Sequence, residues 1–581
     1  MRIFIRLYII VMSLLCFIKQ GFSQTSWTGA VSTSWSASGN WTAGVPTITQ
    51  NAIIGDASFT GAFQPTIAVN AECANLTIGG AVASTLTVNK LLTISGNLTI
   101  NSGATLSQGN TNIVIRGNWI NSGTYTAINS VPLPTVFFAA TNQTIGGSNV
   151  STFRNLTVNP GSTVLLGINI NITSNLLVSG TIDPSESPTY QVSGGNITVT
   201  SGGVAKVNAS TFGGNYSTTV ILNEGSIVEY GSNTTAQSIN ASYTYSTLKI
   251  SGSTVKSLSS GLPALNSTTA SAGNIFVTAG STFDLSSFSA DRGTSVVGGI
   301  LSIANNATLI MGGVGGTSPF PANFATVSLS LGSTVEYKSG AGTQIISPQT
   351  YGNLVLSCTS GTATKTSASA FTIAGNFTTT VGTGTALNFT AGANIAIDGN
   401  VTLGTSTTFN AESFTHTIKG NWANNGTFTG STSTVNLAGS GTAMSGSGTN
   451  NFNNLTVSGF GITATNNAIN ISGDFGTSGP GTFVHASGGT VTMTGASKTI
   501  DGSGITLNNL TISSGFRTST ATLTLTGNLS ATGTLTCSSG TISMSGLSNS
   551  ISGAGAKSFL LYILWVMLSL LLQLVLRLPA H

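Results

Sequence analysis

Residues 433–459 contain the pattern that most constrains the fold of this chain, because variants of it recur along most of the sequence. The stretch has two short runs of β-type residues, 434–437 and 454–457, joined by a link rich in Gly, Ser, Thr and Asn. The second run alternates polar and apolar residues, as a strand with a period of two requires. One such strand cannot bury its apolar face alone, so the pattern predicts that copies of the unit stack on one another.

Three kinds of mark identify the copies. The anchor is Asn-Leu followed by β-type residues, and it begins at Asn75, Asn155, Asn353, Asn454 and Asn509, with a degenerate copy at Thr247. A polar residue followed two positions later by Ile lies upstream of most anchors, at Gln143, Gln237, Gln344, Lys498 and Asn549. A Gly-Asn pair followed by an apolar residue begins at Gly96, Gly117, Gly375, Gly399, Gly420 and Gly527.

The spacing of these marks favours a β-solenoid. Successive anchors are 80, 92, 106, 101 and 55 residues apart, whereas neighbouring Gly-Asn marks are 21 to 24 residues apart. Coils of about 20 to 25 residues explain both sets of spacings. Immunoglobulin-like sandwiches of about 100 residues would fit two of the long spacings but not the shortest. We therefore predict an all-β parallel β-helix or β-solenoid over residues 72–558.

The Gly-Asn marks are interpreted as the corners of the coils. Both residue types tolerate positive φ, which a tight corner can require. Stacked Asn side chains can also hydrogen-bond along a column, as they do in stacked sheets.

The composition excludes several classes of function. Only 5% of the 581 residues are charged, and without Arg2, Arg6 and Lys19 of the leader the chain has 14 basic and 13 acidic residues. Such a chain lacks the basic patch that nucleic-acid binding needs, so no nucleic-acid partner is expected. Outside the leader the three cysteines are more than 170 residues apart, which predicts neither a disulfide framework nor a metal site.

Residues 1–23 are typical of a secretory signal peptide. Arg2 and Arg6 precede an apolar run over 7–18, and Gly21-Phe22-Ser23 offers a cleavage site before Gln24. The chain is therefore expected to be exported.

The segment 24–71 is rich in tryptophan, with Trp27, Trp35 and Trp41 among Gly, Ser and Thr. We interpret it as a cap over the open end of the solenoid, since terminal repeats are atypical. The alternative is a glycan contact, because aromatic faces can stack on sugars.

The style of the repeats resembles a known group of proteins. The Gly-Asn-Trp…Gly-Thr-Phe mark at 420–428, the Trp-Thr-Gly…Trp…Gly-Asn-Trp…Gly-Val-Pro opening and the Phe-x-Asn-Leu-Thr anchors are similar to long secreted β-solenoid surface proteins of Bacteroidota. The resemblance spans about residues 27–559. It implies a parallel β-helix-like, adhesin-like surface role and no catalytic residues, and such proteins usually end in a type IX secretion sorting domain.

The C-terminal segment departs from the repeat. The copy that begins at Asn549 stops at Phe559, and residues 559–576 are mainly apolar, followed by Arg577 and a short tail, 577–581. This length fits a transmembrane helix with a cytoplasmic C-terminus. The alternative is that a shift of reading frame near Phe559 has replaced the continuation of the repeat and the expected sorting domain.

Candidate catalytic residues are few. Asp183 and Glu186 are the closest pair of acids, and they lie in a Pro-rich stretch typical of an exposed turn. Asp398, Glu412 and His416 could be brought together by coils stacked one turn apart, which makes them the best candidates for paired acid and base chemistry. No cofactor and no metal ion are predicted.

The sequence thus favours a non-enzymatic, exported structural or adhesin-like repeat protein. Its partners would be surface glycans or neighbouring surface proteins, reached through rows of Thr, Ser and Asn, and it would contact the membrane if 559–576 forms a helix. The alternative is a glycan-binding module or a carbohydrate-active enzyme, centred on the N-terminal tryptophans or on the region of His416.

Overall fold

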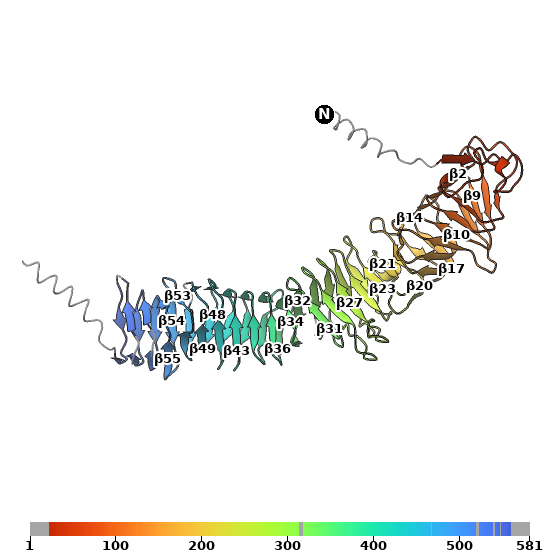
Figure 1. Ribbon diagram of the computed structural model, residues 1–581. Helices are drawn as coiled ribbons and strands as arrows, with labels where there is room; N and C mark the ends of the chain where they lie inside the picture. Colours follow the sequence, from red (N-terminus) through yellow and green to blue (C-terminus); the bar gives the residue numbers. More distant parts are fainter. Residues whose placement is uncertain are drawn as a thin grey trace, which may run out of the picture. The chain divides into compact units, whose positions relative to one another are not determined.

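The chain forms a parallel β-solenoid of about 23 turns in a computed structural model that describes residues 23–312, 318–465, 468–518, 522–537, 541–546 and 548–558 (Figure 1). The helical elements of this part are a four-residue α-helix, α2 (Phe212–Asn215), and a 3-10 turn, η1 (Ser38–Asn40). Strands of successive turns pair in parallel, which confirms the predicted all-β solenoid.

Both predicted terminal segments fall largely outside the described residues. The apolar segment 559–576 and the tail 577–581 lie outside them, as do residues 1–22 of the predicted signal peptide. Within the described ranges, no helix is long and apolar enough to cross a membrane.

The chain divides into two compact units, of which the first comprises residues up to 276, 291–300 and 323–325. Its longest sheet begins in this order: β1 (Ser23–Ser26), β2 (Gln50–Ile54), β5 (Leu76–Ile78), β8 (Leu98–Ile100), β11 (Trp119–Asn121), β14 (Gln143–Gly146), β16 (Thr163–Leu166), β18 (Thr181–Asp183), β21 (Val204–Val207), β23 (Ile227–Tyr230) and β25 (Thr247–Ile250). A four-stranded sheet has the order β12 (Thr124–Ala127), β9 (Thr105–Gln108), β6 (Thr85–Val88) and β3 (Thr66–Ile67). A third sheet extends from β4 (Ala71–Cys73) to β22 (Val220–Leu222) and includes β15 (Ser151–Val158) and β17 (Ile170–Val178).

The second unit comprises residues 277–290, 301–322 and 326 onward. One of its sheets is here called the H sheet: β33 (Gly342–Ile346), β36 (Thr362–Ser367), β39 (Ala386–Thr390), β42 (Thr407–Asn410), β45 (Thr427–Thr429), β48 (Thr449–Phe452), β51 (Ala468–Ile471), β54 (Thr490–Met493), β57 (Asn509–Ile512), β60 (Leu529–Ala531) and β63 (Ile551–Ser552). A second sheet includes β35 (Asn353–Cys358), β38 (Phe377–Val381), β41 (Val401–Leu403) and β44 (Trp422–Asn424) and ends at β62 (Thr541–Met544). The third extends from β34 (Thr350–Tyr351) to β64 (Lys557–Ser558) and includes β43 (Thr415–Ile418).

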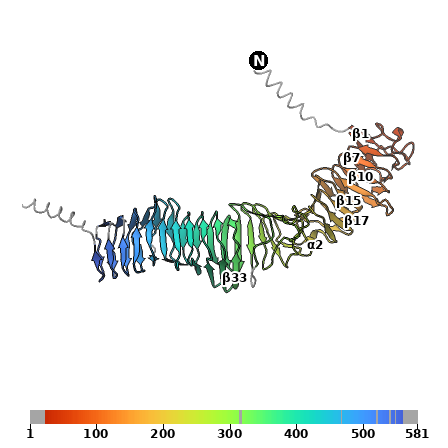
Figure 2. The same cartoon turned by 60° about the horizontal axis from the view of Figure 1, so that its bottom comes forward.

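From β33 onward, each turn of the second unit contributes one strand to each of these three sheets, and Figure 2 shows the strands as a regular stack. Residues that face the interior are buried and alternate with half-exposed ones, as in the pattern of β54. Hydrogen bonds link equivalent corners 21 to 24 residues apart, which confirms the predicted coil length.

The repeat unit at 433–459 is a complete turn rather than a strand, a link and a strand. The two predicted strands coincide with β46 (Thr434–Leu437) and β49 (Asn454–Val457), which pair in parallel. The predicted link also contains β47 (Ala443–Ser445) and β48 on the other two sheets. The strand β48, with the sequence Thr-Asn-Asn-Phe, could not be predicted from an alternation of polar and apolar residues. Its inward residue Asn450 is polar yet fully buried.

The Asn column predicted at the corners is present. Its side chains bond mainly to the backbone of the next corner, and Asn376 Nδ2 also donates to Asn353 Oδ1 at 3.3 Å. The Oδ1 atoms of Asn353, Asn376 and Asn400 each accept a hydrogen bond from the backbone N–H of the next corner, at 2.9, 3.0 and 2.8 Å. Asn421 continues the column to Ala443 at 2.8 Å. The first unit has a matching column through Asn75, Asn97 and Asn118.

The predicted reason for glycine at these corners is wrong. Positive φ occurs at other glycines but not at Gly117, Gly399 or Gly420. A Cβ on Gly420 would instead overlap the backbone of Gly399, and one on Gly399 would overlap Gly375. The glycines are required because the corners of neighbouring turns stack in backbone contact.

Substituting Asn400 with alanine should lower the free energy of unfolding by about 1 kcal/mol, because the N–H of Asn421 loses its protein acceptor. Asn388 is a matched control, since its half-exposed side chain makes no hydrogen bond within the described chain. Asn388→Ala should change stability by less than about 0.5 kcal/mol. Urea unfolding followed by circular dichroism measures both, and equal effects would show that the column does not stabilise the turns.

Candidate binding surfaces and polar clusters

The three N-terminal tryptophans lie in the core. The exposed fractions of Trp27, Trp35 and Trp41 are 0, 2 and 5%. The ring of Trp41 packs edge-on against the other two, with centroid distances of 5.2 and 4.7 Å, and its Nε1 donates to the carbonyl of Trp35. Since these rings offer no open face for a sugar, the burial corrects the proposed glycan contact at these residues.

The segment 24–71 also contains strands of the solenoid. β1 pairs in parallel with β2, and β2 pairs with β5 of the first visible repeat. The parallel ladder therefore extends into the segment predicted as a cap.

Asp398, Glu412 and His416 do not form a site. His416 is 1% exposed and points into the core, where its Nε2 lies 3.0 Å from the carbonyl of Ala411 and its ring packs against Phe409. Burial lowers the pKa of this imidazole. Asp398 and Glu412 are exposed, and Asp398 pairs with Lys419 at 2.7 Å. An inward-facing histidine cannot share a proton with carboxylates on the outer surface.

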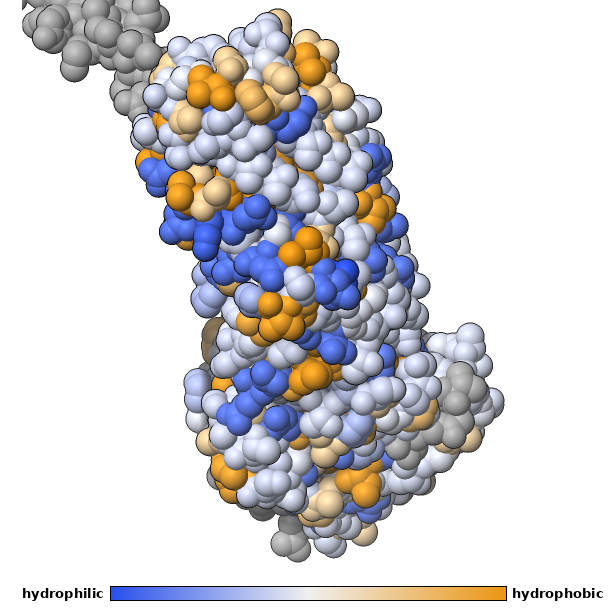
Figure 3. Space-filling model, turned by 90° about the vertical axis from the view of Figure 1, so that its right-hand side faces the viewer, coloured by the Kyte–Doolittle hydropathy of each residue, from blue (hydrophilic) through white to orange (hydrophobic). Residues whose placement is uncertain are grey.

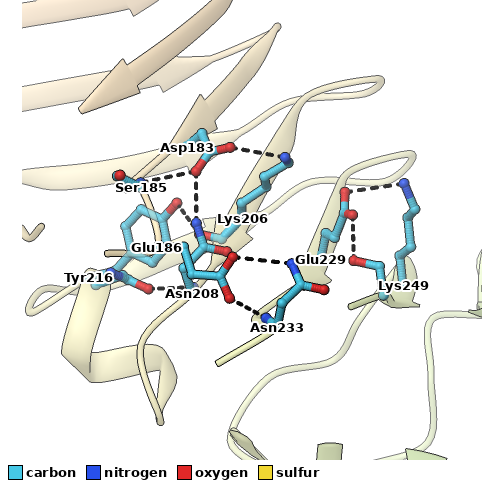
Figure 4. Close-up of polar contacts among 11 residues, drawn as sticks. Asp183, Ser185, Glu186, Lys206, Asn208, Tyr216, Glu229, Asn233 and Lys249 are labelled. Carbon is cyan, nitrogen blue, oxygen red and sulfur yellow. Dashed lines mark hydrogen bonds and ion pairs between the residues drawn. The ribbon is translucent and has the colours of Figure 1, made fainter. Parts of the chain in front are cut away.

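The most extensive cluster of charges lies on the longest sheet of the first unit (Figure 4). Asp183, Lys206, Glu229 and Lys249 occupy successive strands, and strand register aligns Lys206 with Glu229 and Glu229 with Lys249. Lys206 bonds to Asp183 at 2.9 Å, and Lys249 bonds to Glu229 at 3.2 Å. This alternation at the coil period was detectable in the sequence, but a search for clustered acids alone overlooks the lysines.

Glu186 joins this charge column to a loop two turns further along the chain. Its carboxylate accepts hydrogen bonds from the Ser232 hydroxyl at 3.1 Å, from the backbone N–H and side-chain amide of Asn233, and from the Thr234 N–H at 2.9 Å. Burial alone would raise the pKa of Glu186, but these hydrogen bonds outweigh it and lower the pKa. These hydrogen bonds of Glu186 join residues of different turns, so the cluster stabilises the stacking of the turns.

The glutamines of the second landmark of the repeat are buried, and they connect neighbouring turns by hydrogen bonds. Gln237 and Gln344 are 1 and 2% exposed, and each Nε2 donates to two carbonyls of the preceding turn, at 2.8 to 3.1 Å. Strand register places a fully buried lysine beside each glutamine, Lys256 beside Gln237 and Lys365 beside Gln344. The buried lysines could not be predicted from the sequence, because they occupy inward positions of otherwise polar strands.

The two lysines are bound by neutral oxygen atoms. Lys256 Nζ donates to the carbonyls of Ser232 and Thr254 at 2.8 Å, and Lys365 Nζ donates to Ser339 Oγ and Gln344 Oε1 at 2.6 Å. Burial lowers the pKa of each ammonium group to about 8. Both side chains are fully buried, so these groups bind parts of the core to one another.

The lowered lysine pKa values predict a pH dependence of stability. Between about pH 8 and pH 10 an unfolded lysine keeps a proton that the folded one has lost, so the free energy of unfolding rises with pH, by up to about 1.4 kcal/mol per unit for each lysine. Buried Cys73 and Tyr230, whose pKa values burial raises, act in the opposite direction above about pH 9 and pH 10.

Comparison with a variant isolates the lysine contribution. The urea midpoint of Lys365→Met should gain less between about pH 7.5 and pH 9.5 than that of the unaltered chain, while the cysteine and tyrosine effects are common to both. Identical slopes would mean that Lys365 titrates normally in the folded protein.

The outer surface consists mainly of small neutral polar residues. Figure 3 shows one side of the molecule, where most of the surface has intermediate hydropathy. Strongly hydrophilic and hydrophobic residues are interspersed on it. On the four-stranded sheet of the first unit the outward residues are Thr66, Thr85, Thr87, Thr105, Ser107, Thr124 and Thr126.

The H sheet carries a long surface of this kind, here called the Thr/Asn face. Its outward pairs from β36 to β57 are Thr364 and Thr366, Asn388 and Thr390, Thr408 and Asn410, Thr427 and Thr429, Thr449 and Asn451, Ala468 and Asn470, Thr490 and Thr492, and Asn509 and Thr511. Strand pairing aligns them in two columns.

The described residues contain no group of three or more His, Cys, Asp or Glu side chains placed to hold a metal ion. Comparison with protein-family models, with curated proteins and with solved structures gives no match for this chain.

Proposed function

We propose that the chain is a non-enzymatic structural or adhesin-like repeat protein that is exported and acts at the cell surface. The observation that supports this proposal most is the solenoid itself, whose turns present aligned rows of Thr, Ser and Asn on their outer faces. Parallel strands fix each row at a spacing of about 4.8 Å. Such rows can contact glycans or neighbouring proteins weakly at many points, which gives avidity without a deep pocket.

The internal use of its ionisable groups also supports a structural role. The charge column of the first unit is satisfied by contacts between turns, and His416, Lys256 and Lys365 are buried. We assign the signal peptide to export and the solenoid to the extracellular side. Residues 559–576 would anchor the chain to the membrane if they form the predicted helix.

Two experiments test this proposal. Antibodies against the solenoid should label intact cells that express the full chain, and labelling only after permeabilisation would contradict a surface location. Purified protein incubated with diverse polysaccharides should release no new reducing ends and no unsaturated products. Release that persists in a preparation free of contaminating enzymes would support the carbohydrate-active alternative.

A further inference from the structure

The Thr/Asn face is unusually uniform in its chemistry. Fifteen of the sixteen positions in its two columns are Thr or Asn, and Ala468 is the exception; Thr362 and Ala386 also face outward, beside the columns. The ionisable residue within the strands of the H sheet is Lys365, whose side chain is fully buried on the opposite side. The aromatic residues of these strands, such as Phe409 and Phe428, also face the core. The face therefore offers a ligand neither charge nor an aromatic surface.

The hydroxyl groups of this face are available to a ligand. Thr364, Thr408, Thr427, Thr429 and Thr492 are half-exposed, and their hydroxyls make no hydrogen bond within the described chain. Each threonine also presents a methyl group beside its hydroxyl. Rows of small groups that combine both properties can hold water in place without binding it as strongly as charges do.

The array is held rigidly. From β36 to β57 each strand is paired in parallel on the H sheet, and the inward side chains beneath it are packed. Phe389, Phe409 and Phe428 form a column under the face, with centroid distances of 4.9 and 5.4 Å. The outward side chains therefore repeat at the strand spacing of about 4.8 Å over eight strands.

This spacing is close to that of ordered water. Hydrogen-bonded water oxygens lie roughly 2.8 Å apart, and tetrahedral coordination then places next-nearest oxygens roughly 4.5 Å apart. This face has no aromatic surface on which a sugar ring could stack, so the weak glycan contacts proposed above would depend on hydrogen bonds alone here. The neutral character of the face suits a neutral lattice better than a charged partner.

We propose that the Thr/Asn face binds ice, through the ordered layer of water that its hydroxyl and methyl groups align. This inference goes beyond the proposed surface role, since it concerns the purified chain whether or not cells display it. The ligand is the crystal lattice of water, and the binding residues are the outward Thr and Asn side chains of β36 to β57.

Uptake into growing ice tests the proposal with the full chain. The protein is labelled with a fluorophore, and ice is grown slowly on a cooled surface in its solution, beside serum albumin carrying the same label. We expect the chain to be enriched in the ice and albumin to be excluded. Thr408→Tyr, within the face, should reduce uptake to the level of albumin, because a bulky ring interrupts the regular array.

Thr402→Tyr is the matched control. Thr402 is an outward, half-exposed threonine of β41 in the same turn, but it lies on another sheet. This variant should enter ice as the unaltered chain does, and circular dichroism verifies that both variants fold. Exclusion of the unaltered chain from ice, or equal loss in both folded variants, would overturn the proposal. Retention of the chain on an insoluble neutral polysaccharide instead of ice would also overturn it.

Discussion

Replacing Gly420 with alanine should lower the free energy of unfolding by about 3 kcal/mol or more, because the new methyl group would overlap the carbonyl group of Gly399 one turn away. The overlapping atoms of Gly399 belong to the backbone, so no change of side-chain rotamer can relieve the overlap. The two backbones must therefore separate, and the adjacent hydrogen bond from Asn421 to Asn400 would lengthen with them.

Gly382 provides the control for this prediction. A Cβ at Gly382 would lie 3.5 Å from its nearest neighbour, the carbonyl oxygen of Cys358, and the backbone does not have positive φ there. Gly382→Ala should therefore change stability by less than about 1 kcal/mol, and it can stabilise by restricting the unfolded chain. Urea unfolding of both variants decides the matter, and similar losses would refute the role of close stacking at the corners.

Replacing Trp422 with alanine should cost about 3 to 5 kcal/mol of unfolding free energy. The indole is 1% exposed, and its ring packs edge-on against Phe428 at a centroid distance of 5.0 Å. Its Nε1 donates to Oδ1 of the buried Asn450 at 2.9 Å, and Asn424 donates to the same atom at 3.0 Å. The substitution would leave a large cavity and remove one partner of a buried polar group.

Trp422→Phe separates the two contributions. It keeps most of the packing but removes the hydrogen bond to Asn450, so we expect a loss of about 1 to 2 kcal/mol. Urea unfolding followed by circular dichroism measures both variants. If phenylalanine were as damaging as alanine, the hydrogen bond rather than the volume of the ring would stabilise this turn.

The strands at the repeat anchors could be predicted from the sequence because their pattern is local. Asn-Leu-Thr-Val and Asn-Leu-Thr-Ile alternate strictly, and β49 and β57 begin at Asn454 and Asn509 as expected. The coil length followed from the Gly-Asn spacing, since one corner must lie above the next. The strand β48 was not predicted because its inward residue, Asn450, is polar. The Oδ1 atom of Asn450 accepts hydrogen bonds from Trp422 and Asn424, which are more than 25 residues away in the chain.

The candidate site was harder to predict, because the function of a polar residue in a solenoid depends on which face it occupies. The spacing in the sequence predicted that His416 could lie near Asp398 and Glu412. In the structure His416 faces the core, whereas the two acids face solvent. The tryptophans of the first turn could stack on a ligand only if exposed, and composition does not reveal exposure. The burial of Lys365 likewise could not be predicted, because it depends on the strand register that places this lysine beside Gln344.

The distance between spin labels on distant turns tests the stacking of coils most directly. Thr364 and Thr490 lie on β36 and β54, six strand steps apart on the H sheet. Nitroxide labels on cysteines at these positions, in a chain whose native cysteines are replaced by serine, should be roughly 29 Å apart, and labels at Thr364 and Thr427 roughly 14 Å apart. Pulsed electron paramagnetic resonance reads the longer distance and continuous-wave broadening the shorter one. A longer distance far from this value, or no increase between the two pairs, would contradict a parallel solenoid.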